Sequence, residues 1–125
     1  MPRLDHVTIH SRDTRTMISF LETVLGVKEG KRPPFSNPGH WLYLDSHPVV
    51  HIDLVERDDN FPPGMINHCA FALYDFEPAV ERIKSTGYRF EHRDIPDTEL
   101  GQIFVYGPEG LKIELQYRRS NGSIR

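Results

Sequence analysis

The sequence is poor in several features that would each place it in a particular class of protein. Cysteine occurs once, at Cys69, so no disulfide can form within the chain, and a reduced, cytoplasmic setting is the simplest interpretation. No apolar run approaches the ~20 residues of a membrane-spanning helix, and residues 1–10 lack the apolar core of a signal peptide. The net charge of −3 comes with no large basic cluster. We therefore expect neither a membrane nor a nucleic acid among the partners.

What the sequence does contain is an ordinary globular composition. Its 125 residues are 38% hydrophobic and 26% charged, which suits one compact domain with a core of its own. We therefore expect a single domain over residues 1–125.

A strand pattern that carries one carboxylate occurs twice, about 60 positions apart. Residues 50–54 read Val-His-Ile-Asp-Leu, and residues 111–115 read Leu-Lys-Ile-Glu-Leu. Asp53 therefore corresponds to Glu114.

A second pattern, which carries one histidine, repeats at nearly the same spacing. Residues 4–7 read Leu-Asp-His-Val, and residues 66–69 read Ile-Asn-His-Cys, so His6 corresponds to His68. Two matches in the same order predict a duplicated unit. Each copy has a histidine on its first strand and a carboxylate on its last strand.

The first helix is the clearest element between these strands. An apolar stripe at helical spacing is formed by Met17, Phe20, Leu21 and Val24. Ser11 or Asp13 is suited to cap its beginning, and Gly26 is suited to end it.

The predicted order of elements is strand, helix and three strands, twice over. Strands are expected at residues 3–10, 27–31, 41–44, 49–56, 66–74, 88–93, 102–106 and 111–118. The second helix is expected between Asp75 and Gly87. Module 1 then covers about 3–56, a proline-broken linker covers 57–65, and module 2 covers about 66–118. The predicted fold is α+β, with the two βαβββ modules forming a cupped mixed sheet.

Three side chains are the leading candidates for chemistry: His6, His68 and Glu114. Glu114 stands between apolar residues, where a carboxylate must be paired, bound to a metal or turned toward a cavity. Two histidines and a carboxylate can bind Fe(II), Mn, Ni, Co or Zn and leave positions open. The structural alternatives are hydrogen-bonded core histidines and a glutamate that faces water.

Asp53 and His51 share one face of the fourth strand. Asp53 is the counterpart of Glu114 and a candidate fourth metal ligand, although its side chain is one methylene shorter. His51 could contact a substrate, act as a base or replace Asp53 as a ligand. The alternatives are a solvated aspartate and a partly exposed histidine at a sheet edge.

At these residues the sequence resembles the vicinal oxygen chelate superfamily, also called the glyoxalase/bleomycin-resistance/dioxygenase superfamily. The resemblance extends over residues 4–117. Its carriers are residues 4–7, the helix end at 20–26, residues 66–71 (Ile-Asn-His-Cys-Ala-Phe) and residues 107–115 (Gly-Pro-Glu-Gly-Leu-Lys-Ile-Glu-Leu).

The resemblance implies paired βαβββ modules with a divalent metal in the cup. By position the ligands become His6, His68 and Glu114, with Asp53 where members similar to glyoxalase I carry a glutamate. The implied function is a metal-dependent enzyme, a lyase, isomerase or dioxygenase, that acts on a small molecule with adjacent oxygens. The base for an isomerisation would be His51 or Glu114.

Two departures from the family pattern affect this interpretation. Gly107 stands where members usually carry the aspartate of an Asp-Pro-X-Gly turn, and Asp53 is shorter than the usual glutamate. The second departure favours a site with three ligands, as in the fosfomycin-resistance and extradiol-dioxygenase branches. The alternative function is a metal-free protein that sequesters a small molecule, as bleomycin-resistance members do.

The two modules can pair within one chain or between two chains, and both arrangements occur in the superfamily. The linker at 57–65 could span about 30 Å if fully extended, so either is reachable. Pro62 and Pro63 stiffen it, which favours pairing between chains. We therefore expect a homodimer.

Overall fold

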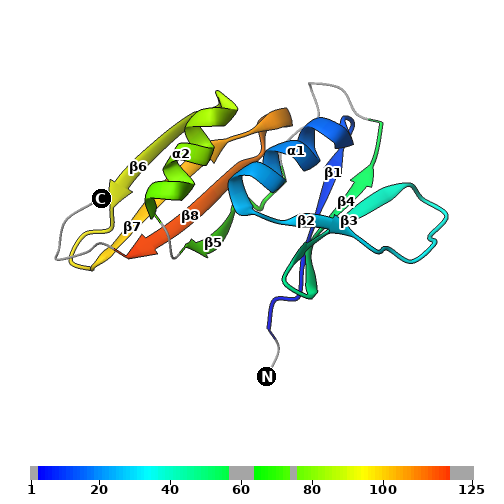
Figure 1. Ribbon diagram of the computed structural model, residues 1–125, viewed down its shortest axis with the longest axis horizontal. Helices are drawn as coiled ribbons and strands as arrows, with labels where there is room; N and C mark the ends of the chain where they lie inside the picture. The colour runs from blue at the N-terminus through cyan, green and yellow to red at the C-terminus, as the bar shows by residue number, and fades with distance from the viewer. Residues whose placement is uncertain (1–2, 57–63, 74–75, 119–125) are drawn as a thin grey trace. The chain divides into compact units, whose positions relative to one another are not determined.

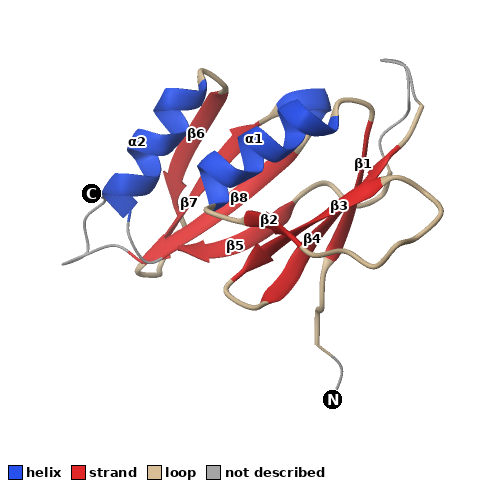
Figure 2. Ribbon diagram, turned by 45° about the vertical axis from the view of Figure 1, so that its right-hand side comes forward, coloured by secondary structure: helices blue, strands red, loops and turns tan. Residues whose placement is uncertain are grey.

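A computed structural model describes residues 3–56, 64–73 and 76–118 of the protein. The chain forms two compact units, Met1–Phe61 (unit 1) and Pro62–Arg125 (unit 2). Within each unit a strand is followed by a helix and three further strands, and the four strands form one sheet (Figures 1 and 2). The α+β fold of two βαβββ modules predicted from the sequence is confirmed.

Unit 1 contains the elements β1 Val7–Ser11, α1 Thr14–Leu25, β2 Lys28–Gly30, β3 Gly39–Leu44 and β4 His47–Leu54. Its sheet has the strand order β1-β4-β3-β2, in which β1 is parallel to β4 and the other neighbours are antiparallel. Thr8 is opposite His51 and His10 is opposite Asp53. These four side chains therefore share one face of the sheet, and His51 and Asp53 lie on the same face of their strand as predicted.

Helix α1 begins and ends where its sequence indicates. The Asp13 carboxylate accepts a hydrogen bond from the Thr16 N–H at 3.2 Å, so Asp13, rather than Ser11, is the N-cap. Gly26 ends the helix in the left-handed conformation, at φ 75°. The core of unit 1 consists of the apolar face of α1 and buried strand residues: Met17, Ile18, Phe20, Leu21, Val24, Leu42, Val50 and Ile52.

Unit 2 contains the elements β5 Cys69–Leu73, α2 Phe76–Thr86, β6 Arg89–Asp94, β7 Leu100–Tyr106, the short 3-10 helix η1 Pro108–Gly110 and β8 Lys112–Arg118. Its strand order is β5-β8-β7-β6, the counterpart of the order in unit 1, and β5 is parallel to β8. Its core is formed by α2 and the facing strand residues: Phe76, Ala79, Ile83, Ile103, Val105, Ile113 and Leu115.

Helix α2 ends as predicted, because Gly87 follows it at φ 75°. The predicted cap Asp75 lies outside the described residues, as does most of the predicted linker at 57–65. Neither α1 nor α2, the helices of the described ranges, combines the length and apolar content that spanning a membrane requires.

The first strand of each unit is shorter than predicted. Strands β1 and β5 begin at Val7 and Cys69, so His6 and His68 each lie one residue before a strand rather than on it. In unit 1 the facing part of β4 contains Pro48, which has no N–H to donate to a neighbouring strand. The two histidines nevertheless keep equivalent positions in the repeat.

The turn between β3 and β4 is also shorter than predicted. Only Asp45 and Ser46 form it, and Asp45 adopts a positive φ of 54°, which aspartate tolerates. His47 and Pro48 already belong to β4. The pairing register shifts between Leu42 and Leu44, and such an irregularity allows a proline within a strand.

Candidate functional site

Glu114 is the buried carboxylate of unit 2. It lies on β8 directly opposite Ala70 of β5 and Phe104 of β7, and only 6% of its surface is exposed. The residues on either side of it, Ile113 and Leu115, are buried in the core. A carboxylate buried in this way requires hydrogen-bond or charge partners.

Each carboxylate oxygen of Glu114 has one neighbour. Oε1 lies 3.0 Å from Nε2 of His68, and Oε2 accepts a hydrogen bond from the Gln102 amide at 3.1 Å. The other ring nitrogen of His68, Nδ1, lies 2.8 Å from Oδ1 of Asn67. An amide oxygen only accepts hydrogen bonds, so Nδ1 carries the hydrogen. Nε2 of a neutral ring then presents a lone pair to Oε1, and a proton or a cation is required between them.

His6 occupies in unit 1 the position that His68 occupies in unit 2. Its Nδ1 lies 2.8 Å from the carboxylate of Asp5, the residue that corresponds to Asn67. A short polar side chain before each histidine therefore engages Nδ1 and leaves Nε2 to face another partner. This role of Asp5 and Asn67 was not predicted from the sequence, although the repeat aligns the two residues.

His51 lies between two other rings of unit 1. Its ring stacks on His6 at a centroid distance of 3.7 Å and on Trp41 at 4.2 Å. Its Nε2 is buried and has no hydrogen-bond partner among the described residues. A buried ring nitrogen without a partner is suited to accept a proton or to contact a ligand.

The neutral form of His51 is favoured by its surroundings. Burial lowers the pKa of His51 and the neighbouring His6 ring lowers it further, against the opposing effect of a hydrogen bond to the Pro48 carbonyl. A histidine with a lowered pKa stabilises the fold above its unfolded pKa of about 6.5, and this contribution is lost as the pH falls toward the folded value. Unit 1 should therefore lose stability on acidification.

Trp41, the only tryptophan, can report this titration, because a protonated imidazole in contact with an indole quenches its fluorescence. We expect Trp41 fluorescence to fall on acidification with a midpoint below pH 6.5. The variant His51→Gln should lose the step and serves as the control. A step that persists in His51→Gln, or a midpoint at or above 6.5, would contradict the assignment.

Asp53 lies beside cationic and imidazole groups of unit 1. Its carboxylate oxygens are 4.0 Å from the Arg32 guanidinium and 3.9 Å from Nε2 of His10, and 30% of its side chain is exposed. Arg32 also donates a hydrogen bond to the Asn37 carbonyl at 3.0 Å. These contacts suit a counter-ion of Arg32.

The structure brings the predicted site residues together in pairs. His68 and Glu114 meet in unit 2, and His6 and His51 meet in unit 1. Within either unit, the described residues contain no group of three or more histidines, cysteines or carboxylates that could hold a metal ion.

Two cationic side chains lie over the Phe104 ring, on the same sheet face as Glu114. The Arg93 guanidinium is 5.2 Å and the Lys112 ammonium 4.7 Å from the ring centroid. A small cavity of about 110 Å³ beside them is lined by Glu91, His92, Arg93, Phe104, Tyr106 and Lys112. Glu91 is paired with Arg89 at 2.6 Å. This surface is suited to hold an anionic group.

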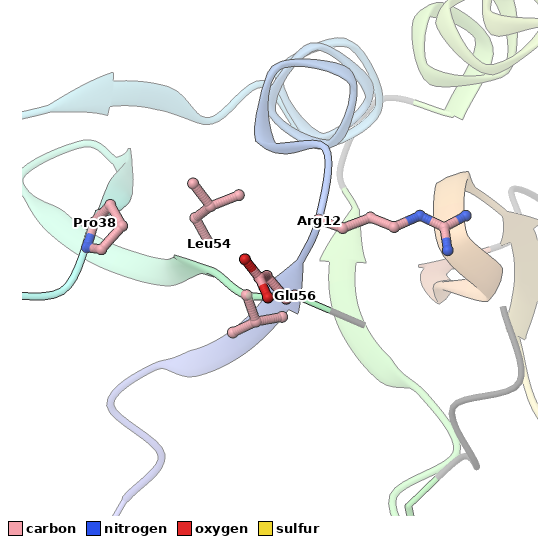
Figure 3. Close-up of a pocket in the computed structure, with 5 residues that line it drawn as sticks. Arg12, Pro38, Leu54 and Glu56 are labelled. Atoms are coloured by element: carbon pink, nitrogen blue, oxygen red, sulfur yellow. The ribbon is translucent and has the colours of Figure 1, made fainter. Parts of the chain in front are cut away.

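A larger hollow, of about 490 Å³, lies at the end of β4 in unit 1 and contains none of the predicted site residues. It is lined by Arg12, Pro38, Leu54, Val55 and Glu56. Figure 3 shows the Arg12 side chain extending away from Pro38 and Leu54.

Comparison with known proteins gives one family. The family model described as Glyoxalase/Bleomycin resistance protein/Dioxygenase superfamily matches residues 3–115. A protein of Bacillus subtilis (strain 168), the uncharacterized protein YwbC, is 28% identical over 123 residues, which cover 93% of this chain and 98% of that protein.

Solved structures with the same fold cover almost the whole chain. The fosfomycin resistance protein FosX from Listeria monocytogenes superposes with a TM-score of 0.73 at 19% identity and covers 99% of each chain. A mutant of that protein, complexed with Mn(II) and 1S,2S-dihydroxypropylphosphonic acid, gives 0.75 at 19% identity, over 98% of this chain and 96% of that one. A glyoxalase/bleomycin resistance protein/dioxygenase from Alicyclobacillus acidocaldarius gives 0.67 at 20% identity, over 95% and 93%.

Proposed function

We propose a function from the premise that this chain belongs to the Glyoxalase/Bleomycin resistance protein/Dioxygenase superfamily. The protein is a divalent-metal-dependent enzyme that acts on a small molecule with adjacent oxygens, as a lyase, isomerase or dioxygenase. Its metal, one of Fe, Mn, Ni, Co or Zn, is held by His6, His68 and Glu114. The observation that carries the proposal is the buried Glu114 oxygen, 3.0 Å from Nε2 of His68.

The donor set of unit 2 fits such an ion. An imidazole nitrogen and a carboxylate oxygen are ligand types that Fe, Mn, Ni, Co and Zn accept. Nε2 of His68 and Oε1 of Glu114 provide one of each, 3.0 Å apart, and together would hold the ion. Histidines that bind metals usually donate their other ring N–H to a carboxylate or carbonyl group, and Asn67 and Asp5 provide such acceptors for His68 and His6.

The residues around the proposed ion would have separate roles in the reaction. When bound, the ion would hold two adjacent substrate oxygens and stabilise negative charge that develops on them. His51 is suited to accept a proton at Nε2, because its lowered pKa keeps the ring neutral near pH 7. The stacked His6 and Trp41 rings hold the imidazole in place.

The cations over Phe104 favour a substrate that also carries an anionic group. Arg93 and Lys112 lie on the same sheet face as Glu114, beside the small cavity of unit 2. The phosphonic acid bound in the Listeria structure combines two hydroxyl groups with such an anion. A phosphonate or carboxylate that carries neighbouring oxygens is the substrate class that we propose.

A second candidate function, a metal-free protein that sequesters a small molecule, is favoured by one observation. Both oxygens of Glu114 already have protein partners, His68 and Gln102, so the pair can persist without an ion. The two functions differ in whether the purified protein takes up a metal ion.

A homodimer is part of the proposal. Three large apolar side chains next to the candidate histidines are exposed: Leu4 at 83%, Met65 at 102% and Ile66 at 86%. Met65 and Ile66 are neighbours in the sequence, and exposed apolar side chains that lie together indicate a surface covered by a partner. A second copy of this chain is the partner that we propose.

The direct test is metal content together with thermal stability. We expect protein prepared anaerobically to contain or take up about one divalent ion per chain, and its melting temperature to rise with Mn(II), Fe(II) or Zn(II). A vicinal diol with a phosphonate group should raise the melting temperature further only when the metal is present. Absence of stoichiometric metal together with an unchanged melting temperature would contradict the enzyme proposal and favour the metal-free function.

A further inference from the structure

Gln102 and Arg93 form a hydrogen-bonded chain that ends on Glu114. The Arg93 Nε–H donates to Oε1 of Gln102 at 3.1 Å, and the Gln102 amide donates to Oε2 of Glu114 at 3.1 Å. Oε1 of Glu114 then faces His68 at 3.0 Å. The chain crosses three adjacent strands, from β6 through β7 to β8.

The pairing register explains why these side chains can meet. Arg93 is directly opposite Gln102, whereas Gln102 is opposite Gln116, two residues beyond Glu114. Residues placed diagonally on neighbouring strands are about 7–8 Å apart, a distance that the side chains of glutamine and glutamate can bridge together. The contact therefore follows from the sheet geometry rather than from sequence proximity.

Arg93 also determines which end of the Gln102 amide faces the carboxylate. A guanidinium only donates hydrogen bonds, so it attracts the amide oxygen and leaves the amide NH₂ for Glu114. In the reverse orientation the amide oxygen would face Oε2, and two acceptors would be in contact. The Arg93 guanidinium is itself held 5.2 Å above the Phe104 ring.

We propose that Gln102 and Arg93 are positioning residues: they hold Oε2 of Glu114 and thereby direct Oε1 toward the ion that Glu114 would share with His68. This inference rests on the proposed metal-binding role of Glu114. Gln102 acts on the carboxylate directly, and Arg93 acts through Gln102. Loss of a group that hydrogen-bonds a metal ligand typically weakens metal binding about 10- to 100-fold. The side chains of this pair should therefore control affinity without binding the ion.

The first test concerns the metal-free protein and uses NMR with a crystal structure of Gln102→Leu. We expect the wild-type Gln102 side-chain NH₂ to give well-resolved, slowly exchanging signals, and Arg93→Met to shift them. In Gln102→Leu the Glu114 carboxylate should leave its position beside Nε2 of His68. If Glu114 keeps that position in Gln102→Leu, the inference is overturned, whatever the protein does with metals.

The second test measures metal binding by calorimetry, together with the visible spectrum of the Co(II)-loaded protein. Gln102→Leu should lower Co(II) affinity about 10- to 100-fold and alter the Co(II) absorption bands. Arg93→Met should do the same more weakly. Arg93→Lys, which keeps the charge but removes the Nε–H, should resemble Arg93→Met rather than wild type.

The double variant separates a hydrogen-bonded chain from two independent effects. Because Arg93 acts through Gln102, adding Arg93→Met to Gln102→Leu should cause little further loss. Additive losses, or wild-type affinity in Gln102→Leu, would overturn the inference while the metal site itself stands. A wild-type protein that binds no metal would instead contradict the proposed function, and the metal-free test would still decide whether Gln102 positions Glu114.

Discussion

Replacing Glu114 by glutamine is expected to abolish stoichiometric metal binding while unit 2 remains folded. The amide has the shape of the carboxylate and can serve the same two neighbours. Its NH₂ can donate to Nε2 of His68, and its oxygen can accept from Gln102, so no buried group is left unpaired. What changes is the negative charge, which the ion requires and the hydrogen bonds do not.

The expected loss of metal affinity in Glu114→Gln is larger than the loss expected for a residue, such as Gln102, that contacts only a metal ligand. Loss of a group that only hydrogen-bonds a metal ligand lowers metal affinity about 10- to 100-fold. Loss of a charged ligand should therefore lower the affinity more than about 100-fold. Calorimetry with Mn(II) or Co(II) measures the affinity, and the melting temperature of the metal-free variant measures the fold. Wild-type affinity in Glu114→Gln, with the fold intact, would remove Glu114 from the ligand set.

Asp53→Ala is the matched control, because Asp53 is the counterpart of Glu114 in the repeat. Asp53 already lies 4.0 Å from Arg32 and is more exposed than Glu114. In a site with three protein ligands, Asp53→Ala should keep its metal. Loss of the metal in Asp53→Ala would instead support four ligands and a site more similar to that of glyoxalase I.

The fold could be predicted because its information is local and periodic. The apolar stripe of α1, the alternation in β4 and the glycines after both helices each follow from short-range preferences. The repeat supplied the order of the elements twice. Strand ends were less predictable, because they depend on the neighbour. The predicted strands 41–44 and 49–56 left Pro48 outside both, whereas the pairing irregularity in β3 accommodates it within β4.

The candidate site was predicted only in part for a related reason. Glu114 could be found because a carboxylate among apolar strand residues requires an explanation. Gln102 and Arg93 could not, because polar residues on strands are common and their contact depends on a diagonal across three strands. The stacking of His51 between His6 and Trp41 likewise depends on pairing between strands. Whether the two units of one chain pair with each other or with the units of a second chain depends on assembly, and an experiment can decide it.

Mixing two variants that each fail to bind metal is expected to restore metal binding if the sites form between chains. In that arrangement His6 of one chain shares an ion with His68 and Glu114 of the other. A heterodimer of His6→Ala and Glu114→Gln then contains one site with both defects and one site with none. Random mixing of equal amounts should recover about a quarter of the wild-type metal content, since about half of the dimers are heterodimers with one intact site.

A second mixture provides the control for subunit exchange and for trace metal. His68 and Glu114 belong to the same unit, so a heterodimer of His68→Ala and Glu114→Gln has a defect in every site, whichever way the units pair. This mixture should recover no metal. Recovery in the first mixture alone therefore identifies shared sites.

The same experiment can contradict the arrangement in two ways. If each site forms within one chain, every chain of the first mixture keeps its own defect, and neither mixture recovers metal even though subunit exchange is demonstrated with labelled chains. If size-exclusion chromatography with light scattering shows a monomer, the homodimer itself is wrong. In that case a partner other than a second copy of the chain is expected to cover the exposed Leu4, Met65 and Ile66.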